Sequence, residues 1–390
     1  MCGRYHLYTL TSINVSPMNN QEELTRHFVF WQNIVSPHQA AFLSELAKLT
    51  KVTLIAERAM DRERIEQKWE VPSMDRVEII VAPTEVQIRE RMSPRAIHVF
   101  SGIDAYPMVY AAFRLAIKKH CFVIVLAEPY QWKGVKGWLR QLKYRCLALQ
   151  YGKSIQAIFA TGSTGVRCFI EAGFPKSKVF PWGYFINPPS FQRQHLSSVQ
   201  SRISPRLLFV GRLDINKNVL GLVETLKYRP ERDYTLTILG SGECAPKLQE
   251  QIAGDPHIKA LGNLPNKEVQ ALMQSHDLLV LPSYYDGWGT VVNEALMNGM
   301  RVVASENCGA SILLDGKLRG EVFSFKQPPM LSEVLDRWIK RGPLTNSERE
   351  GIRLWADKTI SGKVVAKYFL CKVRFITGKI ELDVQAPWIS

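Results

Sequence analysis

The sequence predicts an α/β protein with two domains, and two observations support this prediction. The chain has 390 residues, which suits two domains of ~150–200 residues each. Apolar, β-rich runs alternate with helical patterns at a spacing of roughly 20–30 residues, as in parallel sheets whose strands are joined by helices. Hydrophobic residues make up 46% of the chain, which is enough to fill two cores.

The first half contains six apolar runs that we expect to form strands. These are His27–Trp31, Val52–Ala56, Val77–Val81, Ile97–Phe100, Phe122–Leu126 and Ala157–Ala160. A helix is expected from Ser36-Pro37 to about Leu49, with Ser36 as N-cap and Pro37 in the first turn.

The second half repeats the alternation of strands and helices after a polar stretch. Strands are expected at Leu207–Gly211, Thr235–Leu239, Ile258–Leu261, Leu278–Leu281 and Val302–Ala304. Helices are expected at Asn218–Lys227, Pro246–Ile252, Lys267–Ser275 and Thr290–Asn298. The resulting division is a loose extension over 1–22, a first domain over 23–190, a linker over 191–204, a second domain over 205–345 and a helical return segment over 346–390.

Charge and composition limit the partners and the compartment. The net charge of +14 calls for an anionic partner, such as nucleic acid, anionic lipid or a phosphorylated substrate. No apolar run approaches the ~18 residues that span a bilayer, and the first residues lack the apolar core of a signal peptide. We therefore expect a cytoplasmic protein. The seven cysteines form no C-x-x-C pair and no zinc-like cluster.

The first candidate site follows the strand Leu207–Gly211. The turn Gly211–Asn218 lies between this strand and a helix, where open parallel sheets bind their ligands. Arg212 offers a planar fork for phosphate oxygens, and Lys217 adds a compact charge. Taken alone, these residues could equally be two solvated cations on a loop.

The second candidate site follows the strand Leu278–Leu281. Gly287 and Gly289 allow the backbone to approach a ligand, and the helix that begins near Thr290 presents free N–H groups to a diphosphate. Asp286 precedes this helix and Glu294 lies about one turn inside it. Two carboxylates at this spacing can each accept two hydroxyls of one elongated ligand.

Together these two segments resemble the retaining family 4 glycosyltransferases, which have the GT-B fold of two Rossmann-like domains facing across a cleft. The family carries a G-R-L…K turn and then E-G-x-G-x-x-x-x-E-A-x-x-x-G-x-P-V-V-A. Here these read Gly211-Arg212-Leu213…Lys217 and then Asp286-Gly287-Trp288-Gly289…Glu294-Ala295…Gly299…Val302-Val303-Ala304. The resemblance covers 206–323 well and both ends loosely.

The resemblance implies a role for each matching residue. Arg212 and Lys217 would hold the diphosphate of a UDP- or GDP-sugar, Glu294 the ribose, and Asp286 the hexose, with Arg212, Lys217 and Asp286 as catalytic residues. Further donor contacts are implied at Gly211, Gly240, Gly242, Gly287, Trp288, Gly289 and Thr290. The resemblance also implies retention of configuration and a C-terminal helix that returns to the first domain. It further implies a lipid-linked glycan acceptor in bacterial surface-polysaccharide biosynthesis.

Two departures from the pattern concern the donor site. Asp286 replaces the usual Glu and is one methylene shorter, which affects the choice of sugar, and Arg301 replaces the usual proline. No Asp-x-Asp metal motif is evident, so we expect fixed cations to stabilise the leaving diphosphate without a metal ion or other cofactor.

Three positions in the first domain are candidates for the acceptor side. Glu128 follows the strand Phe122–Leu126 and would orient the acceptor hydroxyl or act as a base, or else it is a solvent-facing turn residue. His98 matches a frequent histidine of the family, or else it is a satisfied core histidine. Ser101-Gly102 forms a turn that would border the acceptor.

The stretch 129–170 contains seven cations and no acid, interleaved with Trp, Tyr and Leu. This pattern favours contact with an anionic membrane surface, at the cytoplasmic face of the inner membrane. The alternative is a helix whose apolar side packs on its own domain.

Other functions explain less of the sequence. Nucleic-acid binding would account for the charge but not for Asp286 and Glu294. A GT-B-fold epimerase or an inactive transferase subunit would be expected to lack part of the Arg212, Lys217 and Glu294 set, all of which is present. The start Met1-Cys2-Gly3-Arg4-Tyr5 resembles SRAP-type DNA-crosslink proteins, but the α/β pattern that follows does not.

Overall fold

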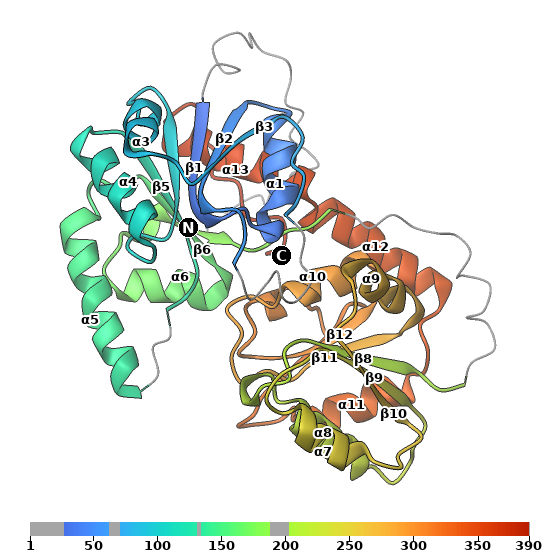
Figure 1. The fold of residues 1–390 in the computed structure, drawn as a ribbon. Helices are drawn as coiled ribbons and strands as arrows, with labels where there is room; N and C mark the ends of the chain where they lie inside the picture. Colours follow the sequence, from blue (N-terminus) through green and yellow to red (C-terminus); the bar gives the residue numbers. More distant parts are fainter. Residues whose placement is uncertain (1–26, 62–70, 131–133, 188–202, 390) are drawn as a thin grey trace, which may run out of the picture. The chain divides into compact units, whose positions relative to one another are not determined.

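The computed structural model describes residues 27–61, 71–130, 134–187 and 203–389, which form two compact units. The first unit contains the described residues up to Ile186 together with those from Thr359 onward, and the second contains those from Asn187 to Lys358. Each unit is built around one parallel sheet (Figure 1). The predicted extension over 1–22 and nearly all of the predicted linker over 191–204 lie outside the described residues.

The first unit has a seven-stranded sheet in the order β3-β2-β1-β4-β5-β6-β7, with all neighbours parallel. Its strands are β1 (His27–Ile34), β2 (Lys51–Arg58), β3 (Val77–Val81), β4 (Ile97–Ser101), β5 (Phe122–Ala127), β6 (Ala157–Thr161) and β7 (Val179–Trp182). Its helices are α1 (Pro37–Ala47), α3 (Glu85–Arg91), α4 (Pro107–Lys118), α5 (Gly134–Tyr151), α6 (Gly162–Glu171) and α13 (Gly362–Ile376). All six predicted strands are confirmed, and β7 is additional.

Strand β1 shows how the sequence builds a core on both faces of this sheet. Successive side chains of a strand point to opposite faces. Val29 and Trp31 join the core that includes Phe113 of α4. Phe28 and Phe30 point to the other face, where α1 and α13 lie. Because both faces are covered by helices, β1 is apolar at consecutive positions, as expected for a central parallel strand.

Helix α13 brings the end of the chain back to the first unit. Its Phe369 ring lies with its centroid 5.0 Å from that of Phe159, 5.3 Å from Phe42 and 5.6 Å from Phe28. At Gly362, the first residue of α13, a Cβ would lie 2.5 Å from the Ala41 carbonyl oxygen of α1, so the two helices touch through backbone. The expected return of a C-terminal helix is therefore confirmed.

The return begins later than the sequence indicated. The return segment was expected from residue 346, whereas α12 (Asn346–Ile360) packs with the second unit over most of its length. Arg349 of α12 donates to the backbone carbonyl of His276 at 2.7 Å, which ties the helix to that unit. The helical pattern of the tail runs through both helices, and only the break at Ser361 separates them.

The second unit has a six-stranded parallel sheet in the order β10-β9-β8-β11-β12-β13. Its strands are β8 (Arg206–Val210), β9 (Thr235–Leu239), β10 (Ile258–Gly262), β11 (Leu278–Leu281), β12 (Arg301–Ser305) and β13 (Gly320–Phe323). Besides α12, its helices are α7 (Val219–Lys227), α8 (Ala245–Ile252), α9 (Asn266–Ser275), α10 (Thr290–Met297) and α11 (Leu331–Lys340). The predicted strands and helices of this half are confirmed within one or two residues at each end.

His98 is a core residue, and its assignment to the acceptor side is wrong. It is the second residue of β4, not the last, and it is fully buried. Trp31 Nε1–H donates to His98 Nδ1 at 3.1 Å, so the hydrogen is on Nε2, which donates to the Ser93 carbonyl at 2.9 Å. Burial lowers the pKa of His98 to about 4, which keeps the ring neutral.

We predict that Phe369→Ala destabilises the first unit by about 3–5 kcal/mol, because it removes a ring from a closed aromatic cluster and leaves a cavity. Urea unfolding followed by tryptophan fluorescence measures this change, since Trp182 lies in the same cluster. The control is Lys367→Ala, an exposed position of the same helix. Equal unfolding midpoints for the two variants would show that α13 does not complete this core.

Candidate active site

The loops that carry the two sequence motifs lie at one edge of the second sheet. Strands β9, β8, β11 and β12 are neighbours in that order and run parallel. Their carboxyl ends therefore meet at the same edge, where open α/β sheets bind ligands. Backbone hydrogen bonds join each of the four following loops to the next.

The loop after β8 is shaped by its own side chains. Asp214 accepts from the Lys217 backbone N–H at 2.8 Å and so caps the short 3₁₀ helix η4 (Ile215–Lys217). Asn218 follows in the left-handed conformation, with φ of 55°. The Arg212 guanidinium lies 3.1 Å from the Asp214 carboxylate and remains largely exposed. This local order holds the two predicted phosphate-binding cations, Arg212 and Lys217, in one turn.

Gly240 and Gly242 allow the loop after β9 to contact the loop after β8. Gly240 has a φ of 135°, and a Cβ there would lie 1.9 Å from the Gly211 carbonyl oxygen. A Cβ on Gly242 would lie 2.5 Å from the Leu213 carbonyl oxygen. Any side chain at Gly240 would push the two loops apart. The structure thus gives the G-x-G turn a packing role besides the predicted nucleotide contact.

The loops after β8 and β11 are joined by a residue that the sequence analysis missed. Asn216 Nδ2 donates to the Tyr285 carbonyl at 2.7 Å, and the Tyr284 N–H donates to the Asn216 carbonyl at 2.8 Å. Next to this contact, Lys217 Nζ lies 2.5 Å from Asp286 Oδ2, and both side chains are largely buried. The side chain predicted to bind the diphosphate, Lys217, is therefore paired with the side chain predicted to bind the hexose, Asp286.

A further loop, the one after β12, completes this edge and was also missed. The Asp286 N–H donates to the Asn307 carbonyl at 3.1 Å, and the Gly309 N–H donates to the Asp286 carbonyl at 3.0 Å. A Cβ on Gly309 would lie 2.3 Å from the Gly287 carbonyl oxygen. The loop contacts Asp286 through its backbone, so the signal in the sequence for this contact was a glycine after a predicted strand.

Helix α10 begins directly at this edge. Gly289 is its N-cap, with φ of 85°. The Val292 N–H donates to the Gly289 carbonyl at 2.9 Å, whereas the Thr290 and Val291 N–H groups lie in the first turn, where no preceding turn supplies acceptors. They give this edge the partial positive charge of a helix N-terminus.

Glu294 lies one turn inside α10 and is partly exposed. None of the described residues donates a hydrogen bond to its carboxylate or forms an ion pair with it. Burial raises the pKa of Glu294 to about 7, from an ordinary value of 4.5. Such an uncompensated carboxyl group suits a ligand that donates hydrogen bonds.

The Trp288 side chain supports the loop, and a donor contact at this residue, as predicted, would be made by its backbone. Its side chain is 2% exposed, and Nε1–H donates to Asn293 Oδ1 at 2.8 Å. Its backbone carbonyl accepts from the Ala310 N–H at 2.7 Å. The indole therefore fixes the loop before α10 against the loop after β12. In the sequence, a tryptophan between two glycines is compatible both with a ligand contact and with this structural role.

The acceptor-side candidates lie in the first unit, on neighbouring strands. Ser101 is the last residue of β4, and the Gly102 N–H donates to the Leu126 carbonyl of β5 at 2.8 Å. Glu128 follows β5 and is exposed. The Tyr184 hydroxyl donates to the Glu128 carboxylate. These residues share the carboxyl edge of the first sheet.

Another ring joins this edge. His38, at the start of α1, has its ring centroid 5.6 Å from that of Tyr184. Tyr184 was not singled out from the sequence, because an isolated tyrosine after a short strand carries no motif.

Two searches of the described residues bear on metal ions and membranes. No three His, Cys, Asp or Glu side chains within 27–61, 71–130, 134–187 and 203–389 come together in a way that could hold a metal ion. No helix in this part of the chain has the length and apolar character needed to cross a bilayer.

The sequence was compared with known families and proteins. Residues 194–355 match the profile of glycosyl transferases group 1. An uncharacterized 41.2 kDa protein of the Klebsiella pneumoniae cps region is 24% identical over 62% of this chain and 68% of its own length. The Escherichia coli lipopolysaccharide glucosyltransferase WaaG is 31% identical over 39% of this chain, and the match spans only 41% of that enzyme.

Solved structures resemble the whole fold. Anabaena Alr3699/HepE, crystallised with UDP, matches with a TM-score of 0.68 and 14% identity, over 89% of this chain and 99% of that one. The lipopolysaccharide outer core galactosyltransferase WaaB matches with a TM-score of 0.65 and 15% identity, over 91% of this chain and 100% of that one. At this identity the likeness establishes the fold, two Rossmann-like units of the GT-B type.

The matched profile lies over the unit in which the four loops bring together Arg212, Lys217, Asp286 and Glu294. The sequence match, the fold and this arrangement agree: residues 194–355 are similar to glycosyl transferases group 1, and the chain has the GT-B fold.

Proposed function

We propose that the protein is a retaining hexosyltransferase, which transfers a hexose from a UDP- or GDP-sugar to a lipid-linked glycan acceptor. The reaction would serve the assembly of a bacterial surface polysaccharide, such as O-antigen, capsule or lipopolysaccharide. Two relatives support this setting by their printed descriptions: one belongs to a cps region, and another is a lipopolysaccharide glucosyltransferase.

The observation that carries the proposal is the charge arrangement at the carboxyl edge of the second sheet. Arg212, Lys217 and the N-terminus of α10 supply positive charge within one set of joined loops. Glu294 supplies an unpartnered acceptor one helical turn away. A nucleoside diphosphate sugar has the matching order of groups: ribose hydroxyls, a diphosphate, and a hexose with further hydroxyls.

In the proposed reaction, the bond between the hexose C1 and the diphosphate oxygen breaks as the acceptor hydroxyl oxygen attacks C1 from the same face. The proton of that hydroxyl passes to the departing diphosphate. Arg212, Lys217 and the first N–H groups of α10 stabilise the negative charge that develops on the leaving group. We propose that these fixed charges do so without a metal ion or other cofactor.

The Lys217–Asp286 pair brings two of the proposed donor-binding side chains into contact. Lys217 Nζ lies 2.5 Å from Asp286 Oδ2. We propose that the diphosphate replaces Asp286 as the partner of Lys217. The Asp286 carboxylate is then free to accept hydroxyls of the hexose, so sugar recognition is coupled to diphosphate binding. The shorter side chain of Asp286 keeps this exchange within the loop.

Glu128 is our candidate for the acceptor side. It is exposed at the carboxyl edge of the first sheet, and the Tyr184 hydroxyl fixes its carboxylate. A carboxylate held in this way can orient the acceptor hydroxyl, whose proton passes to the departing diphosphate. Ser101 and Gly102, at the end of the neighbouring strand, would border the same acceptor.

Helix α5 presents a surface suited to an anionic membrane. Its inner side packs on the first unit through Tyr144, Leu147 and Tyr151. Apolar side chains at spacings of three, four and seven form a second stripe, which is exposed. Its members are Val135, Trp138, Leu139, Leu142 and Leu149, with exposed fractions from 48% to 87%. The stripe is about 20 Å long.

Cations flank the exposed stripe of α5. Lys136, Arg140 and Arg145 are exposed, and Lys143 pairs with Asp104 at 2.7 Å. Both interpretations from the sequence thus describe part of the helix: one side packs on the unit, and the other presents an apolar stripe between cations. We propose that this exposed side lies in the headgroup region of the cytoplasmic leaflet, where a lipid-linked acceptor would be within reach.

The first experiment measures slow hydrolysis and binding of a panel of UDP-, GDP- and ADP-sugars by the purified protein. We expect one donor to be hydrolysed and Lys217→Ala to slow this hydrolysis by about 100-fold, because a charge that stabilises the leaving group is lost. The matched control is Lys247→Ala, an exposed cation of α8 in the same unit. Absence of hydrolysis and binding for every nucleotide sugar would contradict the proposed function.

The raised pKa of Glu294 predicts how donor binding depends on pH. Ribose hydroxyls donate to the ionised carboxyl group, so affinity for the nucleotide should rise as pH increases from about 5.5 to 7 and level off above the pKa of about 7. The folding stability of the protein without ligand changes in the opposite direction. The folded protein holds the Glu294 proton more tightly than the unfolded chain does. The free energy of unfolding therefore falls as pH rises from 4.5 to about 7.

Calorimetric titration with UDP across this pH range tests the prediction. We expect Glu294→Gln to weaken UDP binding about tenfold at pH 8. The variant should also lose the pH dependence that comes from Glu294 and keep only the part that comes from titration of the diphosphate. An unchanged pH profile in Glu294→Gln would rule out a nucleotide contact by this carboxylate.

The membrane proposal predicts binding to vesicles that contain anionic lipid. Trp138→Ser with Leu142→Ser should reduce this binding about 100-fold, because two buried apolar side chains contribute about 3 kcal/mol. Co-sedimentation with phosphatidylglycerol-containing vesicles measures the effect. The control is Tyr228→Ser with Leu354→Ser, two exposed apolar residues of the second unit. Similar losses in both double variants would contradict a specific role for α5, as would equal binding to vesicles of neutral lipid.

A further inference from the structure

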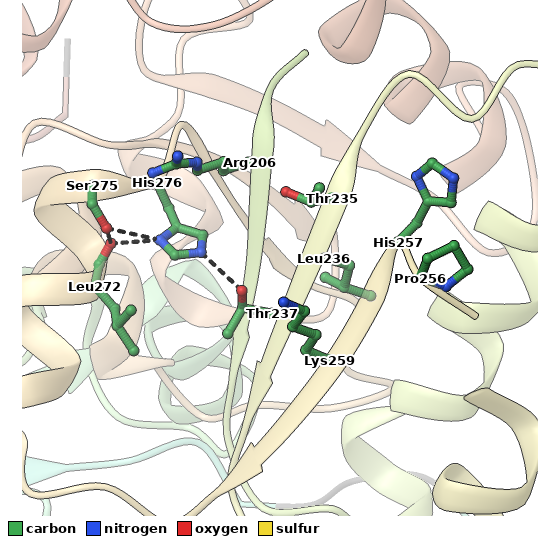
Figure 2. Close-up of a pocket in the computed structure, with 10 residues that line it drawn as sticks. All are labelled: Arg206, Thr235, Leu236, Thr237, Pro256, His257, Lys259, Leu272, Ser275 and His276. Atoms are coloured by element: carbon green, nitrogen blue, oxygen red, sulfur yellow. Dashed lines mark hydrogen bonds between the residues drawn. The ribbon is translucent and has the colours of Figure 1, made fainter. Parts of the chain in front are cut away.

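A second polar site lies at the opposite edge of the sheet in the second unit. Arg206 and Thr235 are the first residues of β8 and β9, and His257 directly precedes β10. A cavity of about 350 Å³ opens at this amino edge (Figure 2). The donor loops lie at the carboxyl edge, about 16 Å away along a five-residue strand. The cavity is therefore separate from the donor site.

Strand register places the cavity's polar side chains on one face. Arg206 is the neighbour of Thr235 on β9, and Lys259 of β10 is the neighbour of Thr237. Thr235 and Thr237 are two residues apart and so point to the same side. In Figure 2 the two threonines lie between His276 on one side and His257 on the other, the Arg206 side chain lies beside His276, and the Lys259 side chain points toward Thr237. Two cations thus border the cavity on either side of two hydroxyls.

Some polar side chains of the cavity are hydrogen-bonded to each other, and others have no partner among the described residues. His276 Nδ1 is 2.7 Å from the Leu272 carbonyl, which can only accept, so the hydrogen of the neutral ring is on Nδ1. Nε2 therefore accepts from the Thr237 hydroxyl at 3.0 Å. The Thr235 hydroxyl and the Arg206 and Lys259 side chains, in contrast, have no hydrogen bond or ion pair to any other described residue.

Two carboxylates next to lining residues already have partners within the unit. Asp255 pairs with Arg232 and accepts from the His257 N–H at 3.0 Å. Asp277 is 1% exposed and accepts from the backbone N–H groups of Arg206, at 2.8 Å, and Leu344, at 3.1 Å. Arg349 lies 3.7 Å from it on the inner side. The Asp277 charge is thus compensated within the unit, which leaves Arg206 and Lys259 to give the cavity its net positive charge.

We propose that this cavity binds a small phosphate monoester of the size of a hexose phosphate. The phosphate group lies over Thr235 between Arg206, whose fork takes two oxygens, and the Lys259 ammonium. The volume is at the lower end of that of ligand sites, so one sugar ring fills the remainder. Apart from its two histidines the lining has no aromatic side chain on which a nucleobase would stack. The inference does not depend on the proposed donor chemistry.

Calorimetric titration of the full-length protein with glucose 6-phosphate, glucose 1-phosphate and inorganic phosphate, at constant ionic strength, tests the proposal. We expect a hexose phosphate to bind more tightly than inorganic phosphate. Arg206→Ala with Lys259→Ala should weaken its binding at least tenfold, and Thr235→Val severalfold. The matched control is Lys247→Ala with Lys340→Ala, two exposed cations of the same unit outside the cavity.

A further variant separates this cavity from the donor site, which also attracts phosphate. Lys217→Ala should leave hexose phosphate binding unchanged if the ligand occupies the cavity. Binding that is lost in Lys217→Ala but retained in Arg206→Ala with Lys259→Ala would overturn the proposal. Equal losses in both double variants would show only general attraction to a basic protein, and no binding up to 10 mM, roughly the weak limit for a metabolite site, would also overturn it.

Discussion

Backbone contacts between neighbouring loops determine where each donor-site side chain of the second unit lies. The loop after β8 contacts the loop after β9 through Gly240, and it contacts the loop after β11 through Asn216. The loop after β11 is in turn bound to the loop after β12 by the backbone of Asp286. Charged side chains are thus carried by turns that cannot move independently. This rigidity is what preorganised electrostatic stabilisation requires, because the charges need no rearrangement when the leaving group departs.

The basic residues of the chain include three separate groups. One lies at the carboxyl edge of the second sheet, where Asp286 pairs with Lys217. Another part flanks the exposed apolar stripe of α5. A third part, Arg206 and Lys259, faces the cavity at the amino edge. Net charge alone could not distinguish these sites, because it reports only that anions are attracted.

The sequence predicted most strands because central parallel strands are apolar at consecutive positions. Strand β7 was missed because its four residues include Pro181, and β13 because it begins with Gly320. In the donor site, Arg212, Lys217, Asp286 and Glu294 were predicted together because each follows a strand or begins a helix in a recognisable pattern. The loop at Asn307 is joined to Asp286 by backbone hydrogen bonds, so no residue type in the sequence indicated this contact.

His98 and Trp288 show what the family pattern leaves open. Both match positions of the family pattern, but each side chain is buried and has its polar atoms satisfied inside its own unit. Periodicity indicates that a strand is buried, but it does not show which partner a polar atom finds. That information depends on residues far apart in the chain, such as Trp31 and His98.

The path of α13 has a consequence for the order of folding. The described residues from 203 to 358 are contiguous in the second unit, which can therefore acquire its core as soon as they have left the ribosome. The first unit, although synthesised earlier, lacks Phe369 until the last helix emerges. During that interval Phe28, Phe30 and Phe42 lack the ring that packs against all three of them. The N-terminal half of the newly made chain is thus the part that needs protection from aggregation, and it is completed last.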